Sequence, residues 1–475
     1  MSPIGKDEWV AQAEERTERG SGRLGLLQRR WEQVPATARF GAVIAAAALL
    51  PLLSDSTFVV RVGLNGLLFA LLALGLNVVV GYAGLLDLGF IAFYGMGAYT
   101  YALLSSDQLG LHWPTELAVL TAVLATVALG YLLGLPSRRL LGDYLAIVTL
   151  FFGQAFVQLV TNVDRLPLPG GRTLDLTGGP NGITGVDQFR IGWIHLQSVQ
   201  DYYWLLIVMF TLGTIVFTNA NNSRTGRAWR AVREDPLAAA AMTIPVNRLK
   251  LLAFAVGAGT AGLAGTVFAA VQLGVFPANF TVTLLIMVYA AVVLGGTGSI
   301  PGVILGAAVI SIVPEILRDP DLARLLFYGV MVVTLLVVLR PWRVLAAILT
   351  GTVLFGFAIR LAVGALWSDA LSPAAGGGIV ARALEAWVVT IPDQVLLANT
   401  AFVVLIAAGL TLTRVRPTVR RLALPPVLYL AAFVWENRLV TDPSVTRQLL
   451  LGVILVVMMN VRPQGLLGKP RVEIL

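Results

Sequence analysis

The residues best suited to chemistry lie in one polar stretch, Asn222 to Lys250, between two apolar runs. Its basic side chains begin at intervals of three residues and end with a separate pair: Arg224, Arg227, Arg230, Arg233, Arg248 and Lys250. Guanidinium groups are always charged and bind carboxylates and phosphates, so this stretch is suited to holding an acidic surface. The pattern indicates binding and not the breaking of bonds.

Two short helices are expected within this stretch, over Gly226–Glu234 and Pro236–Thr243. Proline suits the first position of a helix, and Asp235 before it is a favoured N-cap. The second helix is apolar and small over Leu237–Met242. Two interpretations follow. The helix enters a groove on a soluble protein while the arginines contact acidic residues around it, or the arginines hold it on an anionic membrane surface.

Residues that commonly carry catalysis are scarce in the rest of the chain. There is no cysteine, and the two histidines, His112 and His195, both lie in expected loops. The phosphate-binding pattern G-x-x-x-x-G-K-[ST], the serine motif G-x-S-x-G and the zinc motif H-E-x-x-H do not occur. The chain is therefore not expected to be an enzyme or to hold a metal. Any pumping would draw its energy from a partner or from an ion gradient.

The composition predicts a membrane protein. Hydrophobic residues make up 57% of the chain, charged residues 13%, and the mean hydropathy is +0.81. A soluble chain has about 25% charged residues, so lipid must cover much of this surface. Apolar runs in lipid form helices because their backbone groups must bond within the segment. We predict an all-α polytopic membrane protein, a helical bundle with some short or broken helices.

Fourteen apolar runs are candidates for spans, since several approach the roughly 20 residues that cross a hydrocarbon core. In chain order they are Ala38–Leu53, Val60–Val80, Leu88–Leu104, Leu117–Leu135, Tyr144–Val160, Tyr202–Phe217, Leu251–Leu273, Thr281–Leu294, Val303–Ile316, Leu322–Leu339, Val344–Trp367, Val395–Thr413, Leu424–Leu439 and Gln448–Val461. Some are short enough to be half-helices or re-entrant segments.

The basic residues predict the orientation of these runs. If the N-terminus is inside and the runs alternate, most Lys and Arg fall on the cytoplasmic side, as the positive-inside rule requires. These positions are the N-terminal segment, Arg138–Arg139, Arg224–Lys250, Arg340–Arg343, Arg414–Arg421 and the tail with Arg462, Lys469 and Arg471. Both termini and the polar stretch 222–250 are therefore expected in the cytoplasm.

Two further features lie between runs. The long segment Thr161–Asp201 is expected outside, and its turn formers Thr177–Gly182 indicate either an ordered turn or a surface for an external partner. Asp87 lies between two runs, where it either caps the next helix through the amides of Leu88–Phe90 or lies in a re-entrant break that lines a cavity. No chain of buried acids runs through the helices, which argues against a proton relay.

Several motifs occur together in a characteristic order. They are Gly75–Tyr99, Gly142–Leu150, Thr177–Ile183, Gly226–Asp235 leading into Lys250–Phe254, Gly295–Gly302 and Arg462–Gly465. With them the chain resembles the LivM family, the permease subunits of branched-chain amino acid ABC importers, over about residues 60–342 and the last segment. The stretch Asn222–Lys250 resembles the EAA loop of ABC-importer permeases, through which the ATPases are coupled.

The resemblance implies partners and roles. The partners are a LivH-like permease, LivG- and LivF-like ATPases that bind ATP and magnesium, an external amino-acid-binding protein and membrane lipid; no cofactor is expected on this chain, and no nucleic acid. Coupling to an ATPase would fall to Arg227, Arg230, Arg233, Glu234, Asp235, Leu237, Ala239, Ala240 and Thr243. Residues near the translocation path would be Asn77, Gly81, Asp87, Gly89, Phe90, Tyr94, Gly97, Tyr99, Thr149 and Gln154.

The chain departs from the family pattern at a few places. Thr243 stands where the consensus has glycine, and Gln154 where family members often carry glutamate. About a hundred residues separate two similar copies of the family's last helix, which begin at Arg324 and Arg447. The expected organisation is a cytoplasmic segment 1–37, a permease core 38–342 with the coupling loop 222–250, an additional transmembrane insertion 343–443, and a terminal helix with its tail, 444–475.

The leading functional hypothesis is the permease subunit of an ATP-driven importer in the plasma (inner) membrane, which translocates branched-chain or related amino acids delivered by an external binding protein. The alternatives are an ion-coupled secondary amino-acid carrier and an ABC permease for urea or amides. An ion-coupled carrier would need buried ionisable or carbonyl-lined ion sites, for which Asp87 is the one candidate.

Overall fold

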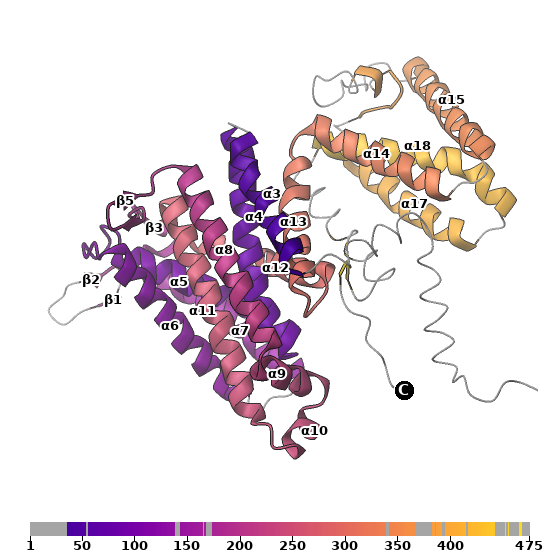
Figure 1. Ribbon diagram of the computed structural model, residues 1–475. Helices are drawn as coiled ribbons and strands as arrows, with labels where there is room; N and C mark the ends of the chain where they lie inside the picture. Colours follow the sequence, from indigo (N-terminus) through magenta and orange to yellow (C-terminus); the bar gives the residue numbers. More distant parts are fainter. Residues whose placement is uncertain are drawn as a thin grey trace, which may run out of the picture. The chain divides into compact units, whose positions relative to one another are not determined.

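The computed structural model describes most of the chain in two compact units, and Figure 1 shows their helices. The described residues are 36–53, 56–137, 143–164, 166–167, 173–338, 342–366, 382–384, 386–391, 395–414, 417–441, 452, 455 and 465–467. Unit 1 comprises Met1–Ala308 with Gln464–Leu475, and unit 2 comprises Val309–Pro463. The division falls within one helix, α13, and each unit is described by itself.

Unit 1 is a bundle of helices built from the apolar runs of the first two thirds of the chain (Figure 1). Its helices are α3 (Ala36–Leu53), α4 (Thr57–Leu76), α5 (Phe90–Leu104), α6 (Thr115–Ser137), α7 (Asp143–Asn162), α8 (Val199–Asn222), α9 (Arg224–Glu234), α10 (Pro236–Ala241), α11 (Val246–Gln272), α12 (Val282–Gly295) and the start of α13 (Ile300–Ile316). The predicted all-α class is confirmed, since the strands are only two residues long.

Helix α11 is the centre of unit 1, where it packs against α5, α6 and α4. Small residues let these backbones approach closely, as membrane helices commonly do. A Cβ placed on Gly97 of α5 would lie 2.2 Å from the Gly262 carbonyl oxygen of α11, and one on Gly265 would lie 2.2 Å from the Tyr94 carbonyl oxygen. Only glycine therefore fits at Gly97 and Gly265 in this contact.

Helix α4 does not end as an ordinary α-helix but continues into the π-helix η1 (Asn77–Tyr82). Single π-turns within α-helices are rare and frequent at functional sites. A Cβ on Gly81 would lie 2.0 Å from Asn77 Oδ1 and 2.7 Å from the Gly298 nitrogen, so no larger residue fits there. The predicted run Val60–Val80 thus ends in a π-helix that the sequence analysis did not foresee, and the chain turns through 83–89 before α5 begins.

A small folded loop region connects the helices at residues 105–114, 163–164, 166–167 and 173–198. Its strands pair as β1 (Leu166–Pro167) with β2 (Thr173–Leu174), β3 (Ile183–Thr184) with β6 (Gly274–Val275), and β4 (Arg190–Ile191) with β5 (Ile194–His195). The turn-forming stretch Thr177–Gly182 is ordered, with the short 3₁₀-helix η2 (Gly179–Asn181) between glycines of positive φ. The second 3₁₀-helix, η3 (Pro277–Asn279), precedes α12.

Unit 2 contains the end of α13 and the helices α14 (Pro320–Val338), α15 (Trp342–Leu366), α17 (Val395–Arg414) and α18 (Pro417–Thr441). The Arg324 guanidinium of α14 is 0% exposed and bonds the Glu436 carboxylate of α18, with 2.8 Å between NH2 and Oε2. Helix α18 also holds the irregular segment 386–391, because Asn437 accepts from the Ile391 amide and donates to the Val389 carbonyl.

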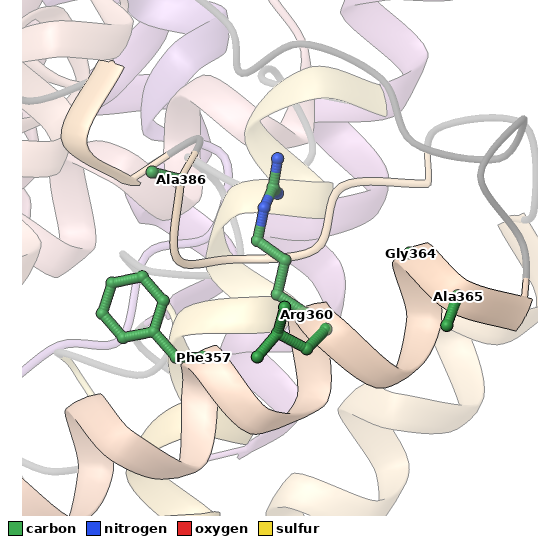
Figure 2. A pocket seen from close by; sticks show the side chains of 6 residues that line it. Phe357, Arg360, Gly364, Ala365 and Ala386 are labelled. Carbon is green, nitrogen blue, oxygen red and sulfur yellow. The ribbon is translucent and has the colours of Figure 1, made fainter.

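A pocket of about 470 Å³ lies in unit 2 beside α15, lined by Phe357, Arg360, Leu361, Gly364, Ala365 and Ala386. Figure 2 shows Arg360 extending from α15 among these residues. Its NH1 group donates to the Val388 carbonyl oxygen at 2.8 Å. The guanidinium therefore satisfies a backbone carbonyl group of the irregular segment 386–391, which has no helical partner there.

Among the described residues, seven helices are long and apolar enough to cross a membrane. They are Thr57–Tyr82, Thr115–Pro136, Asp143–Asn162, Val199–Asn222, Val246–Gln272, Pro277–Gly295 and Trp342–Leu366. Three shorter apolar helices are Phe90–Leu104, Ile300–Ile316 and Leu396–Leu412. Thirteen of the fourteen predicted runs coincide with helices, and the chain is confirmed as a multi-pass membrane protein.

A few predictions fall outside the described residues. They concern most of the N-terminal segment 1–37, the pair Arg138–Arg139 and the run Gln448–Val461 with the tail after it. The proposed division into four sequence regions stays a prediction.

Candidate functional site

The predicted pair of short helices is present at the end of α8. The Ser223 hydroxyl caps α9 by accepting from the Gly226 amide at 3.3 Å, as N-cap serines commonly do. The buried face of α9 carries Trp229 and Val232, and the opposite face is basic. Helix α9 is therefore amphipathic, with its apolar side on the bundle.

Helix α10 follows after one residue, as its sequence predicts. The Asp235 carboxylate accepts from the amides of Leu237 and Ala238 at 2.8 and 3.0 Å, so Asp235 is the N-cap and Pro236 the first helical residue. Leu237 is 83% exposed, and Met242 is 75% exposed. Leu237 of α10 and Met242 just after it thus lie on the surface, where a partner could cover them.

Thr243 ends this pair of helices in a left-handed conformation, with φ of 63°. Such a backbone favours glycine and is costly for a β-branched residue. The sequence comparison with the EAA pattern had indicated that threonine replaces a glycine here. The chain makes the turn that a glycine would make, and the strain remains at Thr243.

Three arginines of α9 are exposed: Arg224, Arg227 and Arg230. The Arg227 NH1 group donates to the Asn222 carbonyl at 3.0 Å and the Arg230 NH2 group to the Asn221 carbonyl at 3.4 Å, both on the preceding helix. Glu234, Leu237, Ala240 and Thr243 are also exposed, whereas Ala239 is buried. This exposed set forms one surface that combines positive charge with apolar side chains.

Arg233 points the other way, toward the bundle. Its NH1 group donates to the Gly81 carbonyl oxygen of η1, and its NH2 group lies 3.4 Å from Thr297 Oγ1, between α12 and α13. Arg233 was predicted with Arg227 and Arg230 as a residue that couples the chain to an ATPase, and that role stays a prediction. Helical geometry places Arg233 on the side opposite Arg224, because the nine residues from Arg224 to Arg233 amount to about two and a half turns.

Trp229 was not singled out from the sequence, although it has a clear role. Its Nε1 group donates to the Leu249 carbonyl of α11 at 2.9 Å, and its ring stacks on Tyr82 with centroids 6.4 Å apart. The signal was available: Trp229 and Val232 are the apolar residues among basic ones at helical spacing. Through Trp229, α9 contacts both η1 and α11.

The residues predicted near the translocation path gather around η1, α5 and α7. Nine of them are buried: Asn77, Gly81, Asp87, Gly89, Phe90, Tyr94, Gly97, Tyr99 and Thr149. Gln154 is exposed on α7 and stands apart from the rest. Tyr94 and Tyr99 belong to an aromatic cluster with Phe156 and Phe280. That these residues border a path stays a prediction.

Asp87 is fully buried in the turn between η1 and α5. Its Oδ1 atom accepts from the Gly89 amide at 2.9 Å, which is the local capping contact expected from the sequence. The Tyr289 hydroxyl of α12 donates to its carbonyl, and the neighbouring Leu88 amide donates to Thr149 Oγ1 at 2.9 Å. The second carboxylate oxygen has no hydrogen-bond partner among the described residues. The turn is thereby joined to α12 and α7.

A small pocket of about 220 Å³ opens beside Arg233, lined by Val80, Gly84, Leu85, Leu86, Arg233 and Thr297. Gly84 has φ of 70°, and a Cβ there would lie 2.7 Å from Arg233 Cγ. Both the backbone conformation and the space require glycine. The arginine side chain therefore lies directly against the turn that follows η1.

The sequence was compared with known families and proteins. Residues 58–339 match the family described as "Branched-chain amino acid transport system / permease component". The high-affinity branched-chain amino acid transport system permease protein LivM of Salmonella typhimurium is 38% identical over 300 residues, which cover 58% of this chain and 67% of that protein. LivM of Escherichia coli is equally similar, with the same identity and coverage.

More distant relatives match a shorter region. The permease protein BraD of Pseudomonas aeruginosa is 28% identical over 261 residues, covering 52% of this chain and 81% of that protein. No solved structure matches the chain. The matched family region covers more than half of the chain and includes η1, α9, α10 and α11. This protein therefore belongs to the family of permease components of branched-chain amino acid transport systems.

Proposed function

We propose that the chain is the transmembrane permease subunit of an ATP-driven importer that translocates branched-chain amino acids. The observation that carries the proposal is the pair α9–α10, which presents exposed arginines and the apolar Leu237 and Met242 next to spanning helices. Relatives are named as permeases for branched-chain amino acids, which supports leucine, isoleucine and valine as the substrates. ATP and magnesium would be bound by partner ATPases and not by this chain.

The partners proposed are a LivH-like permease, two ATPases of the LivG and LivF type, and an external amino-acid-binding protein. The chain is 26% identical to LivH of Escherichia coli over 259 residues, so the two permeases would be related halves of one channel. The complex would lie in the inner membrane with both termini and the α9–α10 surface in the cytoplasm. The basic residues near that surface support this orientation.

In the proposed mechanism, closure of the ATPases displaces α9 and α10 together. Motion reaches the membrane through a short connection, because α11 begins at Val246, three residues after Thr243. The Trp229 side chain adds a direct contact from α9 to Leu249 on α11. Since α11 is the central helix of unit 1, its displacement would tilt its neighbours and switch access between the two membrane faces.

The test is reconstitution of the chain with its partners in vesicles. ATP is enclosed inside the vesicles, and labelled leucine, isoleucine or valine is added to the outside solution. We expect uptake that requires both ATP and the loaded binding protein. Uptake driven by an ion gradient without the ATPases would contradict the proposal, and uptake of urea in place of leucine would revise the substrate.

A variant separates the two interpretations of α10. Leu237→Arg should remove the ATPases during co-purification while the chain stays in the membrane, because a charge would replace the most exposed apolar side chain of that helix. The matched control is Leu111→Arg, an exposed leucine in the loop before α6, which should keep the ATPases bound. Normal ATPase retention by Leu237→Arg would favour a helix that only rests on lipid.

A further inference from the structure

Arg233 differs from Arg227 and Arg230, which donate to carbonyls at the end of α8, because it donates to acceptors in the bundle. Its guanidinium reaches two acceptors on different segments, the Gly81 carbonyl of η1 and Thr297 Oγ1 of the α12–α13 loop. The planar guanidinium fork suits two acceptors at once, and a cation is favoured at the carbonyl end of a helix. The side chain therefore connects three segments that are distant in the sequence.

The two acceptor segments are also joined to each other. The Gly298 amide donates to Asn77 Oδ1 at 2.8 Å, which ties the α12–α13 loop to the first residue of η1. Gly81 and Gly298 approach so closely that a Cβ on Gly81 would lie 2.7 Å from the Gly298 nitrogen. The π-helix and this loop thus form one packed junction, and Arg233 lies on its surface.

A second side chain of α9 contacts the same junction one helical turn earlier. Trp229 stacks on Tyr82, the last residue of η1, at 6.4 Å and an interplanar angle of 21°. Residues four apart lie on one face of a helix, so Trp229 and Arg233 present a common face to η1. Helix α9 consequently touches the helix break directly, besides its chain connections to α8 and α10.

We propose that Arg233 is a positioning residue that makes α9, η1 and the α12–α13 loop move as one body, so that each displacement of α9 shifts the helix break. This rests on the proposed function and assigns to Arg233 the transmission step and not the ATPase contact. The turn that follows η1 carries Asp87 and leads into α5. A displacement of η1 would therefore reach the residues that are predicted to lie near the translocation path.

The experiment compares Arg233→Gln with Arg343→Gln in the reconstituted complex. Both changes remove one positive charge, but Arg343 is exposed near the start of α15 and lies outside α9 and α10. We measure the leucine taken up per ATP hydrolysed, a ratio that does not depend on the amount of assembled complex. Loss of the charge-assisted contacts should lower this ratio about tenfold in Arg233→Gln and leave it unchanged in Arg343→Gln.

The readout separates a positioning role from a merely structural one. In Arg233→Gln the ATPases should still bind and hydrolyse ATP within about twofold of the natural rate, because the exposed α9–α10 surface is intact. An unchanged ratio in Arg233→Gln, or an equal fall in Arg343→Gln, would overturn the proposal. If the unmodified complex shows no ATP-dependent uptake, the proposed function itself fails.

Discussion

Unit 1 and unit 2 bring their helices together by different chemistry. In unit 1, α5 and α11 approach through Gly97, Gly262 and Gly265, with backbone oxygens where a side chain would otherwise stand. In unit 2, α14 and α18 are joined by the buried Arg324–Glu436 pair and by stacking of Phe327 on Trp435, with centroids 4.5 Å apart. The α5–α11 contact depends on the absence of side chains, whereas the α14–α18 contact depends on two opposite charges that neutralise each other.

The difference teaches where polar groups are used. In unit 1, the polar contacts of Asn77 and Arg233 lie at η1 next to α9 and join segments that are distant in the sequence. In unit 2, Asn437 and Arg360 satisfy the backbone of the irregular segment 386–391 and so hold a fixed conformation. Unit 1 includes most of the residues matched to the family, whereas much of unit 2 lies beyond them.

The largest effect is expected from breaking the ion pair of unit 2. Glu436→Leu should destabilise the protein by about 3 kcal/mol, because it leaves a buried guanidinium without its main partner. This is the lower end of the usual range, since Asp321 still lies 3.2 Å from Arg324 NH1. Thermal unfolding in detergent measures the change.

The control for this prediction replaces both charges. Arg324→Met combined with Glu436→Leu should lie within about 1 kcal/mol of the natural protein, because well-packed apolar residues often replace a buried pair without loss. If the double variant is as unstable as the single one, the stability of unit 2 depends on the shape of these side chains and not on their charges.

Adding one methyl group at a glycine contact of unit 1 should lower the stability of the protein nearly as much as breaking the ion pair of unit 2. Gly265→Ala is expected to cost about 2 kcal/mol, since its Cβ would lie 2.2 Å from a backbone oxygen. Gly364→Ala in α15 of unit 2 has no atom within 4 Å of the new Cβ and should gain up to about 1 kcal/mol from helix propensity. The measurement is the unfolding temperature of each variant. If both temperatures shift in the same direction, the predicted difference between the glycines of the two units is wrong.

Strain in unit 1 should be local to the end of α10. Thr243→Gly is expected to stabilise the protein by about 1 kcal/mol, because glycine accepts a φ of 63° without the cost that threonine bears. Ala241→Gly, within α10, should have the opposite sign. Unfolding of the two variants under identical conditions checks the prediction, and a loss of stability in Thr243→Gly would show that the threonine contacts outweigh the strain.

The smallest effect should come from an exposed titrating contact in unit 1, in contrast to the buried ion pair of unit 2. Contacts of His112 with Asp187 at 2.6 Å and with Asp107 at 3.1 Å raise the pKa of His112. A raised pKa in the folded state adds stability that is complete below the unfolded pKa and is lost as pH rises through the folded value.

The unfolding temperature of His112→Gln should therefore differ from that of the natural protein more at acidic pH than at alkaline pH. The side chains are exposed, so salt should reduce the difference further. A difference that is constant with pH would mean that the imidazole contributes by packing and not by charge.

Much of the fold could be predicted because hydropathy determines it directly. Apolar runs specify membrane helices, and the Asp235–Pro236 pair specifies the start of α10 through a local hydrogen bond. The π-helix η1 could not be predicted, since the sequence Asn77–Tyr82 reads as a continuation of an apolar helix and the break is set by contacts from Gly298 and Arg233. Such long-range contacts leave no local pattern.

The candidate site could be predicted only in part. Motif resemblance located the α9–α10 surface, but the direction of each arginine depends on its position around the helix, which places Arg224 and Arg233 on opposite sides. The segment 386–391 lies between the predicted runs Val344–Trp367 and Val395–Thr413, and its β-branched residues before Pro392 disfavour a helix, but the contacts that fix its conformation come from distant residues.

The length of α11 has a consequence for the membrane itself. Its 27 residues extend about 40 Å, whereas a typical hydrocarbon core is about 30 Å thick. The helix must therefore tilt or project beyond the lipid tails, and its tilt would respond to hydrophobic mismatch. Transport should then vary with acyl-chain length, with an optimum bilayer thickness set by this one helix.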